Sequence, residues 1–385
     1  ARIEYAIKHY PAVQWLYRFS MSSAFRLLGL FVRQDPNLVL YNSMIGRSNY
    51  DSPKAIFDYL ISNSRYSHLK HVWAFNEPEK VEGYEKAERI RMDSFAYFKT
   101  ALKAGYWITN VNIERGLKFK KRGTRYLNTW HGVAFNHIGN DVPGRNDYDS
   151  RNVDVVCYES DYSKEVLKRA LRANDDSMIP SGLPRNDELY SVDDNIVCKL
   201  KVKLGLPLDK KIILYAPTWR DSEDMGKDYS LAPPIDFKRW KRELGDEYIV
   251  LLRTHHLTTK LMNVKFDDFV IDMTSYPRIN DLFKVSDILI SDYSACIADF
   301  SILERPIICF AYDYDTYKSA RGLYIDFERE MPNGIFRDET SVINHIKSMD
   351  IGEEKRLTKR LKEKFTNFGG NATEMCVNYL FNKKK

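Results

Sequence analysis

Short apolar runs alternate with longer amphipathic segments along most of this chain. Residues 38–41 and 288–290 are continuous in Leu, Val, Ile and Tyr, the pattern of strands that are buried on both faces. Residues 162–171 instead repeat their apolar positions at helical spacing. Because such segments follow one another nearly throughout, the pattern predicts an α/β fold built around parallel sheets.

The same pattern divides the chain into two units. A polar stretch at residues 191–195, a short helix and residues 207–209 form the expected link between them. A chain of 385 residues is long enough for two cores, since one core rarely grows beyond roughly 250–300 residues. We predict an amphipathic helical segment at 1–35, a Rossmann-like domain at 36–190, and a second one at 191–385 that ends in helices and faces the first across a cleft.

The expected elements cover both units. In the first, we expect strands at 38–41, 71–75, 106–109, 125–128, 153–158 and 177–179, and helices at 54–62, 94–103 and 162–171. In the second, we expect strands at 211–216, 248–252, 269–271, 288–290 and 306–310, helices at 237–244, 279–284 and 296–303, and a helical end at 341–381 that is broken by two glycines. Ligands of such sheets lie beyond the carboxyl ends of the strands, so the residues that follow each strand are the candidates for chemistry.

Composition narrows the possible functions. A hydrophobic content of 44% and a charged content of 29% are those of a soluble globular protein. The five cysteines are scattered and form no Cys-x-x-Cys pair, which favours a reducing, cytoplasmic setting over a disulfide or zinc framework. No apolar run approaches the roughly 20 residues of a membrane-spanning helix. The absence of a Gly-x-Gly-x-x-Gly or Gly-Lys-Ser/Thr loop argues against a dinucleotide enzyme or an NTPase.

The N-terminal segment has an uneven charge. Residues 5–34 contain no acidic side chain, and their basic residues are interleaved with aromatic and aliphatic ones. Such a helix could lie in the interface plane of a membrane or pack on the body of the protein, and the sequence leaves both open. Basic clusters at 118–125 and at the last three residues would attract anionic lipid head groups or a polyphosphate chain, or remain solvated surface.

The most informative strand end is Trp130-His131-Gly132, which follows the strand expected at 125–128. A histidine just past a strand end suits proton transfer, and a following glycine lets the backbone approach a ligand. A loop histidine without catalytic function would look the same in isolation.

Three strand ends in the second half repeat this design. They are Pro217-Thr-Trp-Arg220, Arg253-Thr-His-His256 and Ser291-Asp-Tyr-Ser294. The two-residue period of a strand places Arg253 and His255 on one side, and a helix that begins after Ser294 would offer backbone N–H groups to an anion such as a diphosphate. Each also has an ordinary explanation, with Arg220 in an ion pair, Ser294 as a helix cap and the histidines as loop surface. Together they favour an anion site at the edge of one sheet.

Six motifs in one order carry a resemblance to a known family. They are Leu127-Asn-Thr-Trp-His-Gly132, Ser181-Gly-Leu-Pro-Arg-Asn-Asp187, Leu214-Tyr-Ala-Pro-Thr-Trp-Arg-Asp221, Leu252-Arg-Thr-His255, Ser291-Asp-Tyr-Ser294 with Asp299-Phe300, and Ala311-Tyr-Asp313 with Arg321-Gly322. With Asp51-Ser-Pro-Lys-Ala-Ile56 and Tyr106-Trp-Ile-Thr-Asn110, they resemble the CDP-glycerol glycerophosphotransferase family of teichoic-acid primases and polymerases and capsule-synthesis relatives. The resemblance covers roughly residues 38 to 335.

The resemblance implies a GT-B-type fold, peripheral membrane attachment, and transfer of an alditol phosphate from a CDP-activated donor with release of CMP. It implies that His131 is the catalytic base for the acceptor hydroxyl, and that His255 lies against the donor diphosphate as a second catalytic group. The domain at 36–190 would then bind the acceptor, and the domain at 191–385 the donor. Substrate-binding positions implied by the motifs are Trp130, Gly132, Arg185, Pro217, Thr218, Arg220, Arg253, Ser294, Ala295, Asp299 and Arg321.

Two departures from the family pattern bear on substrate contacts. The family usually has a second serine where this chain has Ala295, so one hydroxyl contact to the diphosphate is lost, although a backbone N–H could serve there. After Trp-His-Gly the family continues with Thr-Pro and paired lysines, whereas this chain has Val133-Ala134 and then Phe135-Asn136-His137. That loop is expected on the acceptor side, so acceptor identity is left open.

We therefore predict a transferase on the cytoplasmic face of the membrane that uses CDP-glycerol, or less favourably CDP-ribitol. Its acceptor would be a lipid-linked saccharide or a polyol-phosphate polymer, in teichoic acid or capsule synthesis. An anionic membrane surface is an expected partner, whereas nucleic acid is not, because the basic clusters carry no reader motif. No cofactor is expected, and no metal site, since the chain has no His/Cys cluster or carboxylate pair that demands one.

Two other classes of function remain open at this point. A glycosyltransferase of the same fold would release UDP or GDP from a sugar nucleotide instead of CMP. A non-catalytic protein that binds polyanion or membrane would bind in a salt-sensitive way without His131, His255 or Ser294.

Overall fold

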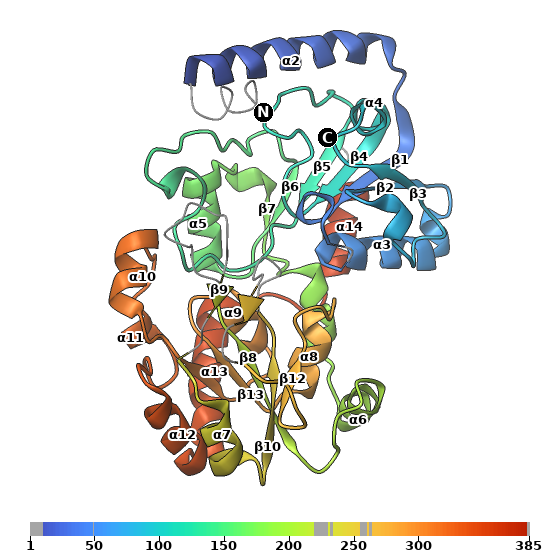
Figure 1. Cartoon of the computed structure of the whole chain (residues 1–385). Helices are drawn as coiled ribbons and strands as arrows, with labels where there is room; N and C mark the ends of the chain where they lie inside the picture. The colour runs from blue at the N-terminus through green and yellow to red at the C-terminus, as the bar shows by residue number, and fades with distance from the viewer. Residues whose placement is uncertain are drawn as a thin grey trace.

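The computed structural model describes residues 11–48, 50–218, 230–231, 234–254, 260–261 and 264–382. Two parallel sheets, of seven and five strands, form the centres of two units that lie one above the other in Figure 1. A further two-stranded sheet pairs β9 (Ser230–Leu231) with β11 (Lys260–Leu261). The predicted α/β, GT-B-type architecture of two Rossmann-like sheets is confirmed.

The first sheet has the strand order β3-β2-β1-β4-β5-β6-β7, and every neighbouring pair is parallel. Chain order reverses between β1 and β4, which creates a crevice at the carboxyl ends of these strands. The strands are β1 (Asp35–Asn42), β2 (Lys70–Phe75), β3 (Glu88–Arg91), β4 (Ala104–Thr109), β5 (Arg125–Asn128), β6 (Val155–Cys157) and β7 (Met178–Ile179).

Helices cover both faces of the first sheet, as the continuous apolar strands require. They are α3 (Ser52–Ser62), α4 (Phe95–Lys103), α5 (Asp161–Leu171) and α14 (Ala372–Asn382). Ser94 and Ser160 cap α4 and α5 through their side-chain oxygens. The prediction placed all terminal helices in the second unit, but Cys376, Val377 and Leu380 of α14 pack into the core of the first sheet. Figure 1 shows this red helix within the upper unit.

The second sheet has the order β12-β10-β8-β13-β14, again entirely parallel. Its chain order reverses between β8 and β13, so a second crevice forms there. The strands are β8 (Lys211–Ala216), β10 (Tyr248–Leu252), β12 (Val270–Asp272), β13 (Ile288–Ser291) and β14 (Ile307–Cys309). The helices are α6 (Asp194–Lys203), α7 (Phe237–Leu244), α8 (Ile279–Val285), α9 (Cys296–Ser301), α10 (Tyr314–Arg321), α11 (Phe327–Glu330), α12 (Glu339–Ser348) and α13 (Ile351–Phe365).

Helix α2 (Pro11–Phe31) lies across the end of the first unit that faces away from the second (Figure 1). One side packs on the body of the protein, where Met21, Phe25 and Leu28 contact the core of the first sheet. The other side exposes eight large apolar residues, namely Val13, Trp15, Leu16, Tyr17, Phe19, Leu27, Leu30 and Phe31. In the described part of the chain, no helix combines the length and hydropathy needed to cross a membrane.

Candidate functional site

His131 lies just beyond the carboxyl end of β5, at the edge of the first sheet where β1 and β4 also end. Its Nδ1 lies 2.8 Å from the backbone oxygen of Asn110, which follows β4. A carbonyl oxygen can only accept, so Nδ1 carries the hydrogen and Nε2 keeps its lone pair. Burial lowers the pKa of His131 below that of an ordinary histidine. The ring is therefore neutral at pH 7 and can accept a proton at Nε2.

The backbone on either side of His131 adopts conformations that bring it close to the second unit. Trp130 has a φ of 56° and its ring centroid lies 4.1 Å from that of His131. Gly132 has a φ of 138°, and a Cβ added to it would lie 3.0 Å from the Cβ of Ala295 and 3.4 Å from Nη2 of Arg185. Glycine is required here both by its φ and by this close approach.

The guanidinium of Arg185 joins the two units at this point. Its Nη2 donates to the backbone oxygen of His131 at 3.1 Å and to Oδ2 of Asp299 at 2.7 Å, and its Nη1 lies 3.3 Å from the Asp51 carboxylate. Asn186 donates to the other oxygen of Asp299 at 2.6 Å. Burial works against the charge of Arg185, yet the carboxylates of Asp299 and Asp51 hold its pKa above the ordinary value. Arg185 and Asp299 thus fix the backbone that presents His131.

The loop after β13 supplies the side of the site that belongs to the second unit. Oδ1 of Asp292 accepts from the backbone N–H of Thr218 at 2.8 Å, which connects the ends of β8 and β13 at the crevice of the second sheet. The hydroxyl oxygen of Ser294 accepts from the N–H of Cys296, which begins α9, at 3.3 Å. Ala295 follows and contacts Gly132 as described. Gly132 of the first unit and Ala295 of the second therefore meet beside His131.

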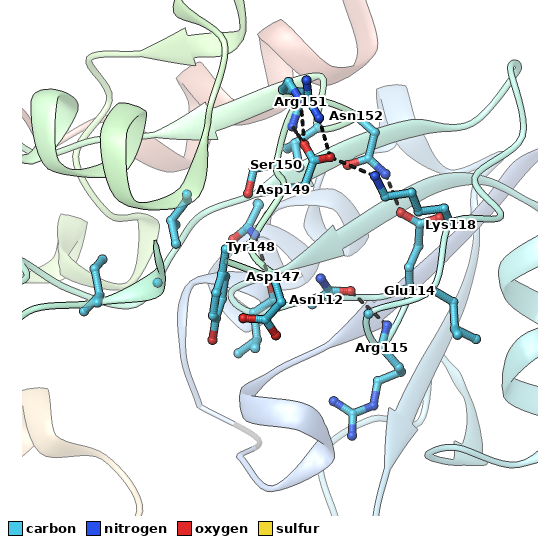
Figure 2. Close-up of a pocket in the computed structure, with 18 of the residues that line it drawn as sticks. Asn112, Glu114, Arg115, Lys118, Asp147, Tyr148, Asp149, Ser150, Arg151 and Asn152 are labelled. Atoms are coloured by element: carbon cyan, nitrogen blue, oxygen red, sulfur yellow. Dashed lines mark hydrogen bonds and ion pairs between the residues drawn. The ribbon is translucent and has the colours of Figure 1, made fainter. Parts of the chain in front are cut away.

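A cavity of about 640 Å³ is lined by residues of both units, including His131, Arg185, Ser294, Ala295 and Asp299. Five of the positions predicted from sequence are thus brought together. A second cavity, of about 880 Å³, also includes His131 and extends toward α2. It contains two further predicted residues, Trp130 and Arg321. Figure 2 shows part of this second cavity, with side chains from residues 112–118 facing those from 147–152.

The remaining predicted residues are placed differently. Pro217, Thr218 and Arg253 are not among the described residues that line either cavity. Nη1 of Arg253 donates to the backbone oxygens of Met273, at 3.2 Å, and Tyr276, so this part of its guanidinium holds the loop after β12. Arg220 and His255, together with His256 and the basic tail at 383–385, lie outside the described residues.

Several residues at the candidate site were not singled out individually from the sequence. Arg278 brings a guanidinium to the smaller cavity, where Glu188 and Asp281 hold it at 2.9 and 3.1 Å. Asp51 and Asn110 belong to segments that carry the family resemblance, but their contacts to Arg185 and His131 depend on the fold. Only the position after a strand end could have indicated Asn110. Among the described residues, no three His, Cys, Asp or Glu side chains are grouped to hold a metal ion.

Residues 24–382 match the sequence profile of CDP-Glycerol:Poly(glycerophosphate) glycerophosphotransferase. The teichoic acid poly(glycerol phosphate) polymerase of Staphylococcus epidermidis is 32% identical over an alignment of 333 positions, and the match covers 82% of this chain and 46% of that protein. The chain thus spans about half the length of this relative. The teichoic acid glycerol-phosphate transferase of Staphylococcus aureus is 32% identical over an alignment of 356 positions, and the match covers 88% of this chain and 90% of that protein. A variant of the wall teichoic acid polymerase TagF, soaked with CDPG, has a TM-score of 0.82 at 27% identity, covering 93% of this chain and 92% of that one.

Proposed function

This chain belongs to the CDP-glycerol:poly(glycerophosphate) glycerophosphotransferase family, and we propose that it transfers glycerol phosphate from CDP-glycerol to a hydroxyl of a polyol-phosphate acceptor. The resemblance found in its motifs is confirmed by the match over residues 24–382. The observation that carries the proposal is the position of His131. This residue lines both cavities, and its Nε2 carries no proton.

In the proposed reaction, the acceptor oxygen attacks the β-phosphorus of CDP-glycerol. A new P–O bond forms to the acceptor, the bond to the bridging oxygen of the diphosphate breaks, and CMP leaves with those electrons. Nε2 of His131 takes the proton of the attacking hydroxyl, since Nδ1–H is held by the Asn110 carbonyl. Arg185 holds His131 in position by donating a hydrogen bond to its backbone oxygen.

We assign the donor to the smaller cavity. The Ser294 hydroxyl and the Arg278 guanidinium supply hydrogen-bond donors there for the diphosphate. The sequence motifs add Arg220, Arg253 and His255 as donor-binding groups, with His255 stabilising the charge that develops on leaving CMP. Ala295 offers only its backbone N–H where the family usually has a serine hydroxyl.

We further propose that the protein docks on the inner face of the cell membrane through α2 and takes a lipid-linked acceptor. The supporting observation is that α2 exposes eight large apolar residues, Trp15 and Phe31 among them, while its packed side connects it to the body. Residues 11–31 include no acidic side chain, which suits an anionic surface.

The test is nucleotide release with a short glycerol-phosphate oligomer as acceptor. CDP-glycerol is expected to yield CMP and an oligomer heavier by glycerol phosphate units, whereas CDP-ribitol is expected to yield much less. Release of UDP from a sugar nucleotide, with no CMP from either CDP-alditol, would contradict the proposal and indicate a glycosyltransferase.

A further inference from the structure

The lining of the larger cavity has more basic than acidic side chains, although two of the basic ones, Arg115 and Lys120, pair with Asp93 and Asp154 outside the lining. It contains eight arginines and lysines and three carboxylates. The basic residues are Arg18, Arg26, Arg115, Lys118, Lys120, Arg145, Arg151 and Arg321. The acidic ones are Glu114, Asp147 and Asp149. In the described lining of the smaller cavity, by contrast, Asp and Glu outnumber Lys and Arg.

Two of the three carboxylates, Asp149 and Asp147, each hold two basic side chains, which fixes these cations in place and leaves more positive than negative charge. Asp149 accepts from Lys118 at 2.8 Å and from Nε and Nη2 of Arg151, each at 2.8 Å (Figure 2). The hydrogen bond from Arg151 holds the pKa of the Asp149 carboxyl well below its usual range. Asp147 lies 3.2 Å from Arg18 and 3.4 Å from Arg145. Each cluster therefore keeps one positive charge in excess.

The third carboxylate, Glu114, contacts no basic side chain of the described residues and instead holds the wall of the cavity together. Oε1 of Glu114 accepts from the backbone N–H groups of Phe119 and Lys120 at 2.5 and 2.8 Å, and its other oxygen accepts from Asn152. Figure 2 shows Glu114 turned toward Asn152 and Lys118. These bonds join the two loops that form the cavity.

The cavity connects two places that matter for an acceptor. At one end it includes Trp130 and His131, the proposed base. At the other it includes Arg18 and Arg26 of α2, and Nε of Arg26 donates to the backbone oxygen of Lys118 at 2.7 Å. A chain lying in this cavity would pass from the packed side of α2 to the reacting centre.

We propose that the larger cavity is a binding site for the phosphodiester backbone of the acceptor, with the Asp149 and Asp147 clusters each contacting a phosphate. This inference rests on the proposed function and names the part of the acceptor that the site recognises. A phosphodiester carries one negative charge, and a guanidinium or ammonium held in place by a carboxylate can still donate to it. An uncharged saccharide would not need such an excess of cations.

The test compares acceptors and variants under steady-state conditions. In Lys118→Ala/Arg151→Ala, the KM for a glycerol-phosphate oligomer is expected to rise by about tenfold or more. The KM for CDP-glycerol and the rate with free glycerol at saturation are expected to stay at the wild-type values. The matched control is Arg356→Ala, because Arg356 is also an exposed arginine with two bonds to a neighbouring carboxylate, Glu353, but lies on α13. It should leave every constant unchanged.

Measuring the binding of an acceptor oligomer directly tests the inference without relying on turnover. A fluorescent glycerol-phosphate oligomer should bind the wild type and Arg151→Lys, which keeps the charge, and bind the double variant much more weakly. An unchanged oligomer KM in a folded double variant would overturn the inference. Loss of binding to anionic vesicles, with oligomer binding intact, would also overturn it and assign the cluster to lipid. If the wild type releases no CMP from CDP-glycerol with any acceptor but still binds the oligomer through these residues, the proposed function fails and this site remains.

Discussion

Arg185 and Asp299 form a buried ion pair of 2.7 Å between the first unit and the second. The same guanidinium nitrogen donates to the backbone oxygen of His131. The contact between the units and the position of the proposed base therefore depend on one side chain. Asn186 and Asp51 complete the pairing, so neither charge is buried without a partner.

Asp299→Asn is expected to lower both stability and turnover. The substitution removes the negative charge beside the buried Arg185, which should cost about 2–3 kcal/mol in the free energy of unfolding. Turnover should fall because Arg185, without its partner, no longer holds the backbone of His131 in place. Denaturant unfolding and CMP release measure the two effects. The control is Glu353→Gln on the exposed surface of α13, and an equal loss of stability in that variant would contradict a special role for the buried pair.

Gly132→Ala should reduce turnover by about 10²-fold through displacement of the neighbouring histidine. The added Cβ would lie 3.0 Å from the Cβ of Ala295, in a backbone conformation that side chains rarely adopt. Combining it with Ala295→Gly removes the collision but not the backbone strain, so recovery should be partial. Full activity in Gly132→Ala alone would show that the close approach is not needed.

Glu159 should make the stability of the protein fall between about pH 4.5 and pH 7. Burial, followed by the nearby charge of Asp299, raises the pKa of its carboxyl to about 7. Between its unfolded and folded pKa values, the folded state holds a proton that the unfolded state has lost, so stability decreases as pH rises and then levels off above pH 7. The change amounts to ~3 kcal/mol at most.

Glu159→Gln should flatten this profile. The stability of the variant relative to the wild type should therefore be higher at pH 8 than at pH 5. Urea unfolding at a series of pH values from 4.5 to 8 measures the difference between the two proteins. Parallel profiles for wild type and variant would rule out Glu159 as the titrating group.

The acid limb of kcat/KM should have its midpoint below the ordinary histidine pKa of about 6.5. Burial lowers the pKa of His131 in the free protein, so the base stays unprotonated to lower pH than a solvated histidine would. Asn110 contacts His131 through its backbone oxygen, whereas its side chain bonds Met44 and Ser43. Asn110→Ala keeps the carbonyl, so it should leave the midpoint nearly unchanged and serves as a control. A midpoint above 7 would contradict the assignment.

The fold could be predicted well wherever strands were continuous and apolar. Strand β3 (Glu88–Arg91) was missed because it is an edge strand in which only Ile90 is buried, so its sequence does not differ from a polar loop. The placement of α14 was also wrong, because an apolar helix face does not say which sheet it covers.

The sequence indicated which residues follow strand ends, but not which residues these contact. His131 and Arg185 follow strands of the first sheet, and Ser294 and Ala295 follow β13 of the second, so their positions could be found from strand ends. That they line one cavity with Asp299 of α9 depends on how the two units pack. Their partners lie far apart in the chain, and a single polar residue such as the Asn110 carbonyl carries no sequence pattern. The basic stretch at 118–125 was identified from the sequence, but the ion pairs that join Lys118 to Asp149 and Arg18 to Asp147 were not, since ion pairs between distant segments leave no periodic trace.

The most direct test of the account is single-turnover CMP release from bound CDP-glycerol in His131→Ala, measured beside the affinity for CDP-glycerol. If His131 is the base, the rate at saturating donor should fall by about 10²–10⁴-fold while donor affinity stays near the wild-type value. A collapse of donor affinity, with an unchanged rate at saturation, would contradict the account and make His131 a donor-binding residue.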